Sequence, residues 1–222
     1  TLFRSDKEAK DNNGQTALML ASDNGEVEAL KVLIAAKANK EARGKLGRTA
    51  LIYAANNGHA HAVQALLAVG ADMEAKDNRE RTALMYAAHK GHADAVQTLL
   101  AVGADMEAMD AEGHTAMMWA ARMGEVDIVK ALIQHGANGV NELMAAARNN
   151  REMAATLIQA GADGTAALLE LAGQGSRQRL KLLIGLGADK VKDDEGKTAL
   201  MRAVEMAAPG NDKVLKALLA AG

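Results

Sequence analysis

A short phrase returns at a fixed interval along this chain of 222 residues. It starts at threonines spaced 33 residues apart and reads TALML, TALIY, TALMY and TAMMW. These threonines are Thr16, Thr49, Thr82 and Thr115. A fixed period of this length predicts a stack of small supersecondary units, in which each repeat contacts its neighbours, and not a globule around one closed core.

Each repeat continues in the same order after its threonine. A glycine follows nine residues later, and then come apolar residues at i, i+3 and i+4, such as Val63, Leu66 and Leu67. That spacing is one stripe of a helix. A further glycine, such as Gly70, suits the left-handed conformation that ends a helix, and the threonine is a predicted N-cap. The predicted repeat is helix, turn, helix, turn and a polar connection.

This order resembles the ankyrin repeat, whose 33-residue unit carries T-P-L-H-x-A, A-x-x-G-H and V-x-x-L-L-x-x-G-A-D. The third repeat matches at residues 82–88 (TALMYAA), at Gly91-His92 and at residues 96–105 (VQTLLAVGAD), although Ala83 and Met85 replace the proline and the histidine. The resemblance implies an all-α ankyrin-repeat solenoid of stacked antiparallel helix pairs with short projecting turns or β-hairpin fingers. It also implies a structural role for the Gly-His turns.

About seven repeats are expected in a single elongated domain spanning residues 1–222. Residues 1–10 resemble the tail of a preceding repeat, and the repeats lie near 11–43, 44–76, 77–109, 110–138, 139–163, 164–189 and 190–222. The fifth and sixth are shortened, because Gly136, Gly161 and Gly187 are only 25 and 26 residues apart, so both are expected to lack a finger. The seventh carries a small insertion at 208–211.

Two positions depart from the repeat pattern. Lys37 occupies the place of Gly70 and Gly103, where a left-handed lysine would cost roughly 1 kcal/mol. Neither end carries a polar capping repeat, which favours a fragment of a longer repeat protein.

Composition excludes several functional classes. The net charge of −2 argues against a general nucleic-acid binder, and the absence of cysteine excludes disulfides and thiolate metal sites. No apolar run is long enough to span a bilayer. Together with twelve methionines and no signal-like start, this composition fits a cytoplasmic protein.

The sequence carries no pattern typical of catalysis or of cofactor binding. No G-x-x-x-x-G-K-[ST], G-x-S-x-G or H-E-x-x-H motif is present, and the acidic residues are scattered by the repeat. His59 and His61 have the wrong spacing for two ligands on one helical face. We therefore expect no enzyme activity, no cofactor and no metal.

Three of the four aromatic residues stand at one repeat position: Tyr53, Tyr86 and Trp119. Residues three and four positions further share their helical face: Asn56, Asn57, His89, Lys90, Arg122 and Met123. The resemblance places this face in a concave groove. Aromatic and arginine side chains at the centre of a groove are typical of a binding hot spot. The alternative is a half-buried structural position that recurs through duplication.

Charged residues gather at the predicted finger tips. Arg48, Arg79, Arg81 and His114 are predicted site residues there, and the fingers also carry Arg43, Lys45 and Lys76 between acidic residues. Such a mildly basic rim could steer an acidic peptide. The alternative is a solvated edge that maintains solubility.

The leading hypothesis is a non-catalytic, monomeric protein–protein interaction module that binds a peptide or a folded partner in its groove. The alternative is a structural or regulatory spacer of a larger multidomain protein, which packs against its own chain and associates end to end through Leu218 and Leu219 when isolated. Nucleic-acid binding along the basic fingers is the weakest hypothesis, and it would require a steep dependence on salt.

Overall fold

The computed structural model describes residues 6–137, 139–206 and 213–222. Within these residues the chain forms 14 α-helices and one short 3-10 helix, with no strand. The bounds are α1 Ala17–Asn24, α2 Val27–Ala35, α3 Ala50–Asn56, α4 Ala60–Ala68, α5 Ala83–His89, α6 Ala93–Ala101, α7 Ala116–Met123, α8 Val126–Gln134, α9 Val140–Asn149, α10 Arg151–Ala160, α11 Gly164–Gly173, α12 Arg177–Gly185, η1 Ala188–Lys190, α13 Ala199–Met206 and α14 Lys213–Ala221. The chain divides into two compact parts, an N-terminal part (residues 1–120) and a C-terminal part (121–222).

The repeated threonines start the first helix of their repeats. The hydroxyls of Thr16, Thr49 and Thr82 each accept the backbone N–H three residues later at 3.4 Å, which confirms the predicted N-caps. Such a cap satisfies one of the backbone donors that the first helical turn leaves without a partner. At the other end of a helix pair, Lys37 adopts φ +58°, the left-handed conformation predicted for it.

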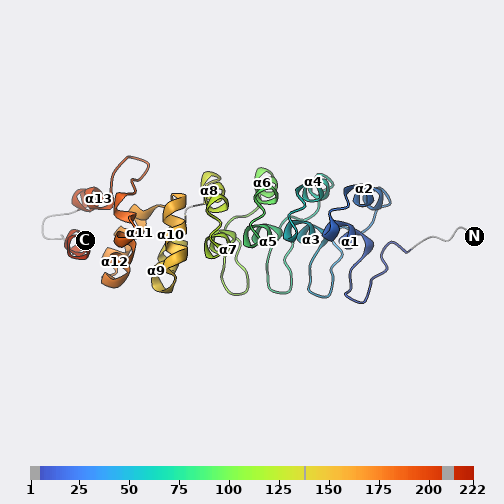
Figure 1. Ribbon diagram of the computed structural model, residues 1–222, viewed down its shortest axis with the longest axis horizontal. Helices are drawn as coiled ribbons and strands as arrows, with labels where there is room; N and C mark the ends of the chain where they lie inside the picture. The colour runs from blue at the N-terminus through green and yellow to red at the C-terminus, as the bar shows by residue number, and fades with distance from the viewer. Residues whose placement is uncertain (1–5, 138, 207–212) are drawn as a thin grey trace, which may run out of the picture. The chain divides into compact units, whose positions relative to one another are not determined.

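In the N-terminal part, α1, α3 and α5 form one row and α2, α4 and α6 form a second row (Figure 1). The finger loops extend from the side of the first row. The core lies between the rows and between successive repeats, where Leu51, Ile52, Leu66, Leu84 and Leu99 are at most 1% exposed. The helix stripe read from the sequence is therefore the buried face of each pair.

Two histidines join successive helix pairs. The Nε2 atom of His59 lies 3.0 Å from the carbonyl oxygen of Asp23, and that of His92 lies 3.1 Å from the carbonyl oxygen of Asn56. The His59 ring packs so closely on Gly25 that a Cβ on this glycine would lie 2.6 Å from Nδ1. The histidines of the Gly-His turns thus have a structural role, and Gly25 and Gly58 make room for the histidine of the next repeat.

A ladder of cations connects the fingers. Lys10 Nζ donates to the carbonyl of Arg43 at 2.9 Å, Arg43 Nη1 to that of Lys76 at 2.6 Å, and Lys76 Nζ to that of Met109 at 3.3 Å. Residues predicted as rim charges therefore also hold neighbouring fingers together. The fingers are closed turns without strands in the described residues.

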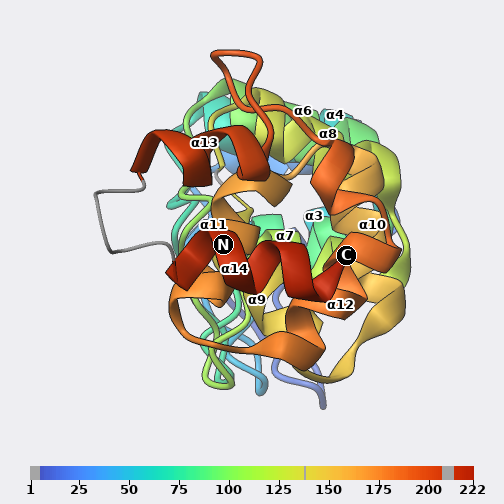
Figure 2. The same cartoon turned by 90° about the vertical axis from the view of Figure 1, so that its left-hand side faces the viewer.

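In the C-terminal part, the shortened repeats lack fingers, as the sequence predicts. Side chains in short links start two of the helices. Asn150, between α9 and α10, accepts Met153 N–H through Oδ1 at 3.0 Å, and Asp163, between α10 and α11, accepts Ala166 N–H through Oδ1 at 2.9 Å. Helix α14 packs against α11, α12 and α13 (Figure 2). The insertion predicted at 208–211 lies outside the described residues.

Candidate functional site

A buried aspartate organises the third finger. Asp77 Oδ1 accepts the backbone N–H groups of Arg79 at 2.8 Å and Arg81 at 2.9 Å, while Oδ2 accepts the Tyr86 hydroxyl at 2.7 Å and Arg81 Nη2 at 3.0 Å. The Asp77 residue is only 6% exposed. Burial of a carboxylate is costly unless donors replace its water, and these four bonds supply them.

The fourth finger has the same arrangement. Asp110 Oδ1 accepts the backbone N–H groups of Glu112 at 2.9 Å and His114 at 2.8 Å, and Oδ2 accepts the indole Nε1–H of Trp119 at 3.1 Å. Asp110 is also buried. The aromatic position thus supplies a donor to the aspartate nine residues before it.

Other repeats follow this pairing with different residues. In the seventh repeat, Arg202 Nε donates to Oδ2 of Asp193. In the second repeat, a glycine, Gly44, takes the place of the aspartate. A Cβ atom at Gly44 would lie 3.3 Å from the Tyr53 hydroxyl. The sequence carries this signal as an aspartate nine residues before a Tyr, Trp or Arg, but sequence reasoning missed it.

The three aromatic rings differ in exposure. Tyr53 is 7% exposed and Tyr86 is 3% exposed, whereas Trp119 is half-buried. Guanidinium groups cover the tyrosines, since Arg48 Cζ lies 6.0 Å from the centroid of Tyr53 and 4.6 Å from that of Tyr86, and Arg81 Cζ lies 4.5 Å from the latter. These distances allow cation–π attraction. Tyr53 and Tyr86 therefore have mainly internal contacts, and Trp119 is the most accessible of the three rings.

The surroundings of Asp77 and Tyr86 change the pKa values of both side chains. Burial raises the pKa of the Asp77 carboxyl, but hydrogen bonds from the backbone of Arg81, the Tyr86 hydroxyl and the backbone of Arg79 outweigh it, so the pKa falls below its ordinary value of 3.8. Burial, followed by the hydrogen bond to Asp77, raises the pKa of Tyr86 to about 12, against the opposing charges of Arg48 and Arg81. Asp77 therefore remains ionised and Tyr86 remains protonated at neutral pH.

Trp119 lies among several predicted site residues. The His89 ring meets it edge-on with centroids 4.7 Å apart, and the His114 ring lies 5.1 Å away at 57°. A cavity of about 140 Å³ opens beside the indole, and its lining is Arg79, Arg81, Asp110, Ala111, Glu112 and Trp119. The structure thus brings Arg79, Arg81 and Trp119 to one place, and we call it the Trp119 pocket.

The other predicted residues are spread along the helix ends. Asn57 Nδ2 links two repeats by donating to the carbonyl of Asp23 at 2.7 Å, and Asn56 Nδ2 donates to Asn57 Oδ1 at 2.9 Å. Lys90 follows α5 and is exposed. Arg122 and Met123 are exposed on α7 and belong to the C-terminal part.

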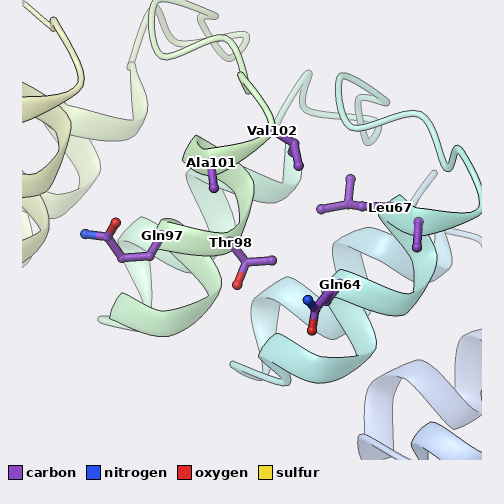
Figure 3. Close-up of a pocket in the computed structure, with 7 residues that line it drawn as sticks. Gln64, Leu67, Gln97, Thr98, Ala101 and Val102 are labelled. Atoms are coloured by element: carbon purple, nitrogen blue, oxygen red, sulfur yellow. The ribbon is translucent and has the colours of Figure 1, made fainter.

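A second hollow of the N-terminal part lies between α4 and α6 (Figure 3). It measures about 550 Å³ and is lined by Gln64, Leu67, Ala68, Gln97, Thr98, Ala101 and Val102. Its lining has no charged side chain, and no site residue predicted from the sequence lies in it.

A recess of about 280 Å³ occurs in the C-terminal part next to the shortened repeats. It is lined by Ile133, Gly136, Ala137, Gly161, Asp163, Val191, Lys192, Asp193 and Asp194. The links without fingers leave this side of the repeats open.

Within the part of the chain that the structure describes, no group of three or more His, Asp or Glu side chains could hold a metal ion. None of the described helices has the length and apolar character needed to cross a membrane.

A family model described as ankyrin repeats (3 copies) matches the sequence at residues 1–77, 62–142, 84–167 and 143–222. These matches cover the whole chain, so it belongs to the ankyrin-repeat family. Comparison with curated protein sequences gives no match. Ankyrin-repeat domains are generally protein-interaction modules and are typically not catalytic.

Proposed function

We propose that the chain is a non-catalytic, monomeric protein–protein interaction module of the cytoplasm, acting as one domain over residues 1–222. A peptide or a folded partner binds the face formed by the first helices and the fingers. The observation that carries this proposal is the Trp119 pocket, where the accessible indole lies beside two arginines. The residues proposed to form or support this binding site are Tyr53, Tyr86, Trp119, Asn56, Asn57, His89, Lys90, Arg122, Met123, Arg48, Arg79, Arg81 and His114.

The geometry favours binding because the site is held in place before a partner arrives. Asp110 fixes the indole through Nε1, and the finger that carries Asp110 is closed by backbone bonds. A preformed surface loses little conformational entropy on association. Tryptophan and arginine are also the residues most enriched among binding hot spots. The tyrosines act in this proposal mainly as supports that position Arg48 and Arg81.

The test is substitution of Trp119 by alanine. The partner is first captured from a lysate of the source cell by the immobilised chain, identified and purified, and its affinity is then measured by calorimetry. We expect Trp119→Ala to weaken binding by more than about 1 kcal/mol, or about fivefold. Trp119→Tyr is the matched control for folding, because Tyr86 shows that a tyrosine at this position can donate to the finger aspartate. Unchanged affinity in a folded Trp119→Ala variant would refute the proposal.

The alternative function is a spacer within a larger protein. Exposed apolar side chains on α13 and α14 favour it, since Leu200 is 43%, Val204 58% and Leu219 61% exposed, although Leu218 is buried at 6%. Large exposed apolar patches mark interaction surfaces. Sedimentation velocity over a range of concentrations separates the two functions, because a spacer would self-associate and Leu219→Lys would weaken that association.

A further inference from the structure

The side chains that line the Trp119 pocket have more hydrogen-bond donors than acceptors available for a ligand. Both oxygens of Asp110 already accept N–H donors from its own finger and from Trp119. Glu112 lies 3.6 Å from His114 Nδ1, and its side chain is 65% exposed, so it is directed largely to solvent. The Asp110 carboxylate is therefore engaged by its own finger and by Trp119, and the Glu112 carboxylate, although it lines the pocket, is directed largely to solvent.

The arginines of the lining have donors in reserve. A guanidinium carries five N–H donors. Arg81 donates through Nη2 to Asp77 at 3.0 Å, while its Nε is buried and has no acceptor. Arg79 is exposed at the finger tip and lies in no ion pair found in the described residues. A buried donor without an acceptor costs free energy. Arg79 and Arg81 both line the pocket, so their remaining donors are available to a ligand with acceptor oxygens.

The size and walls of the pocket limit the ligand. About 140 Å³ is room for roughly five water molecules at about 30 Å³ each, which suits one short side chain and excludes a helix. The indole of Trp119 forms an apolar wall for the carbon atoms of that side chain. Guanidinium groups bind carboxylates with paired, charge-assisted hydrogen bonds.

We propose that the Trp119 pocket receives the carboxylate of an aspartate or glutamate side chain in the bound protein partner. Arg79 and Arg81 donate to the carboxylate oxygens, and the methylene groups of the ligand pack on Trp119. The partner segment that enters this pocket is acidic. This inference rests on the proposed function for its biological setting, but the pocket can be tested without any partner.

The experiment is an NMR titration of the ¹⁵N-labelled chain with N-acetyl-glutamate α-amide, which carries a single side-chain carboxylate. We expect saturable shifts of the Trp119 indole N–H and the Arg81 Nε–H signals. The isosteric neutral compound N-acetyl-glutamine α-amide should cause no saturable shift of these signals. N-acetyl-glycine and inorganic phosphate, in separate titrations, show whether a terminal carboxylate or a phosphate binds better, and stronger binding of either would overturn the assignment to an acidic side chain.

Arg79→Glu is the decisive variant, because this side chain is exposed at the tip and only its backbone carbonyl bonds to the next finger. We expect it to weaken the glutamate titration at least fivefold. Lys45→Glu is the matched control, since it makes the same charge change on the exposed tip of the preceding finger, outside the pocket. Equal titrations for Arg79→Glu and the unaltered chain, or equal shifts with the glutamine analogue, would overturn the inference. The Trp119→Ala measurement with the captured partner would still decide the proposed function separately.

Discussion

At the residue scale, the buried aspartate of a finger requires a hydrogen-bond donor on the side chain nine positions later. Asp77 and Asp110 are buried, and each requires a donor for Oδ2 besides the backbone groups bound to Oδ1. Tyr86 and Trp119 supply it with different chemical groups. The recurrence of aromatics therefore has a hydrogen-bonding reason as well as a packing one, and tyrosine or tryptophan can serve at the same position.

The raised pKa of Tyr86 predicts an alkaline loss of stability. Unfolded tyrosine titrates near pH 10, whereas burial and the bond to Asp77 raise the folded pKa to about 12. Between these pH values the unfolded chain has lost this proton and the native chain keeps it, so stability falls as pH rises. This contribution is fully present below pH 10 and is lost as the pH rises through about 12. Tyr86→Phe should therefore be less stable at neutral pH, and its stability should fall less steeply over the alkaline range.

Urea unfolding at a series of alkaline pH values measures this dependence. The matched control is Tyr53→Phe, which removes the other tyrosine, and the hydroxyl of that residue faces Gly44 in place of an aspartate. A Tyr86→Phe variant with the same alkaline slope as the unaltered chain would contradict the assignment.

Sequence reasoning identified the aromatic position and left a half-buried structural role open beside a binding role, but it missed the hydrogen bonds to the finger aspartates. The period of 33 residues aligned Tyr53, Tyr86 and Trp119, because alignment along a repeat needs no coordinates. The contact of Arg48 with the Tyr86 ring joins two successive repeats, so it arises only when the repeats are stacked. The contact of Arg81 with the same ring depends on how the finger folds within its own repeat.

At the element scale, the turns within the first two helix pairs are adapted to the pair that follows. Gly58 has φ +73°, and a Cβ on it would lie 2.6 Å from Nδ1 of His92. Gly70, at the end of the same repeat, has a similar φ of +72° but no neighbouring atom within 4 Å of its Cβ position. A side chain at Gly70 would therefore meet only backbone strain, whereas one at Gly58 would meet backbone strain and a steric clash.

We predict that Gly58→Ala destabilises the chain more than Gly70→Ala. The left-handed conformation costs about 1 kcal/mol at either position, but Gly58→Ala also displaces the His92 ring from its contact with the Asn56 carbonyl. Urea unfolding of the two variants gives both free energies. In the double variant Gly58→Ala/His92→Ala the excess cost should disappear, since the ring that meets the Cβ is gone. Equal effects of the two single variants would show that the histidine moves aside without cost.

Helix positions were predictable from the sequence because each is set by local signals. Thr49 and Thr82 cap their helices as expected, and the apolar stripes face the core. The side-chain caps of α10 and α11, Asn150 and Asp163, were not foreseen. These residues stand outside the period, so the alignment of repeats gave no guide to them.

At the scale of the whole molecule, the two compact parts differ in how their repeats are connected. In the N-terminal part, side chains of one finger donate to backbone carbonyls of the next, as Lys10, Arg43 and Lys76 do. In the C-terminal part, the shortened repeats have no fingers to connect. Stability in a repeat array is approximately a sum over repeats and the interfaces between neighbours.

We therefore predict that the C-terminal part unfolds at a lower urea concentration than the N-terminal part. Trp119 is the single tryptophan and belongs to the N-terminal part, so its emission reports on that part, whereas far-UV circular dichroism reports on all helices. The far-UV dichroism signal should begin to decrease at a lower urea concentration than the one at which the Trp119 emission changes. Arg202→Ala, which removes the contact with Asp193, should shift only the first transition, seen by circular dichroism, to a lower urea concentration. Coincident transitions would show instead that the chain unfolds as one cooperative system.

The architecture of the array was the most predictable feature of all. A period of 33 residues leaves little freedom in the order of helices and turns, and the matches to the ankyrin-repeat model cover the entire chain. The division into two compact parts was not predicted, because it depends on how densely neighbouring repeats contact one another.

The ladder of cations between fingers has a consequence for how this chain can evolve. Each rung ends on a main-chain carbonyl of the next finger, as when Lys10 reaches Arg43 and Arg43 reaches Lys76. A carbonyl is present whatever the amino acid, so the acceptor survives when the side chain on that finger mutates. Selection can therefore diversify the outward-facing residues one repeat at a time, and duplicated or exchanged repeats join their new neighbours without compensating substitutions at the acceptor position.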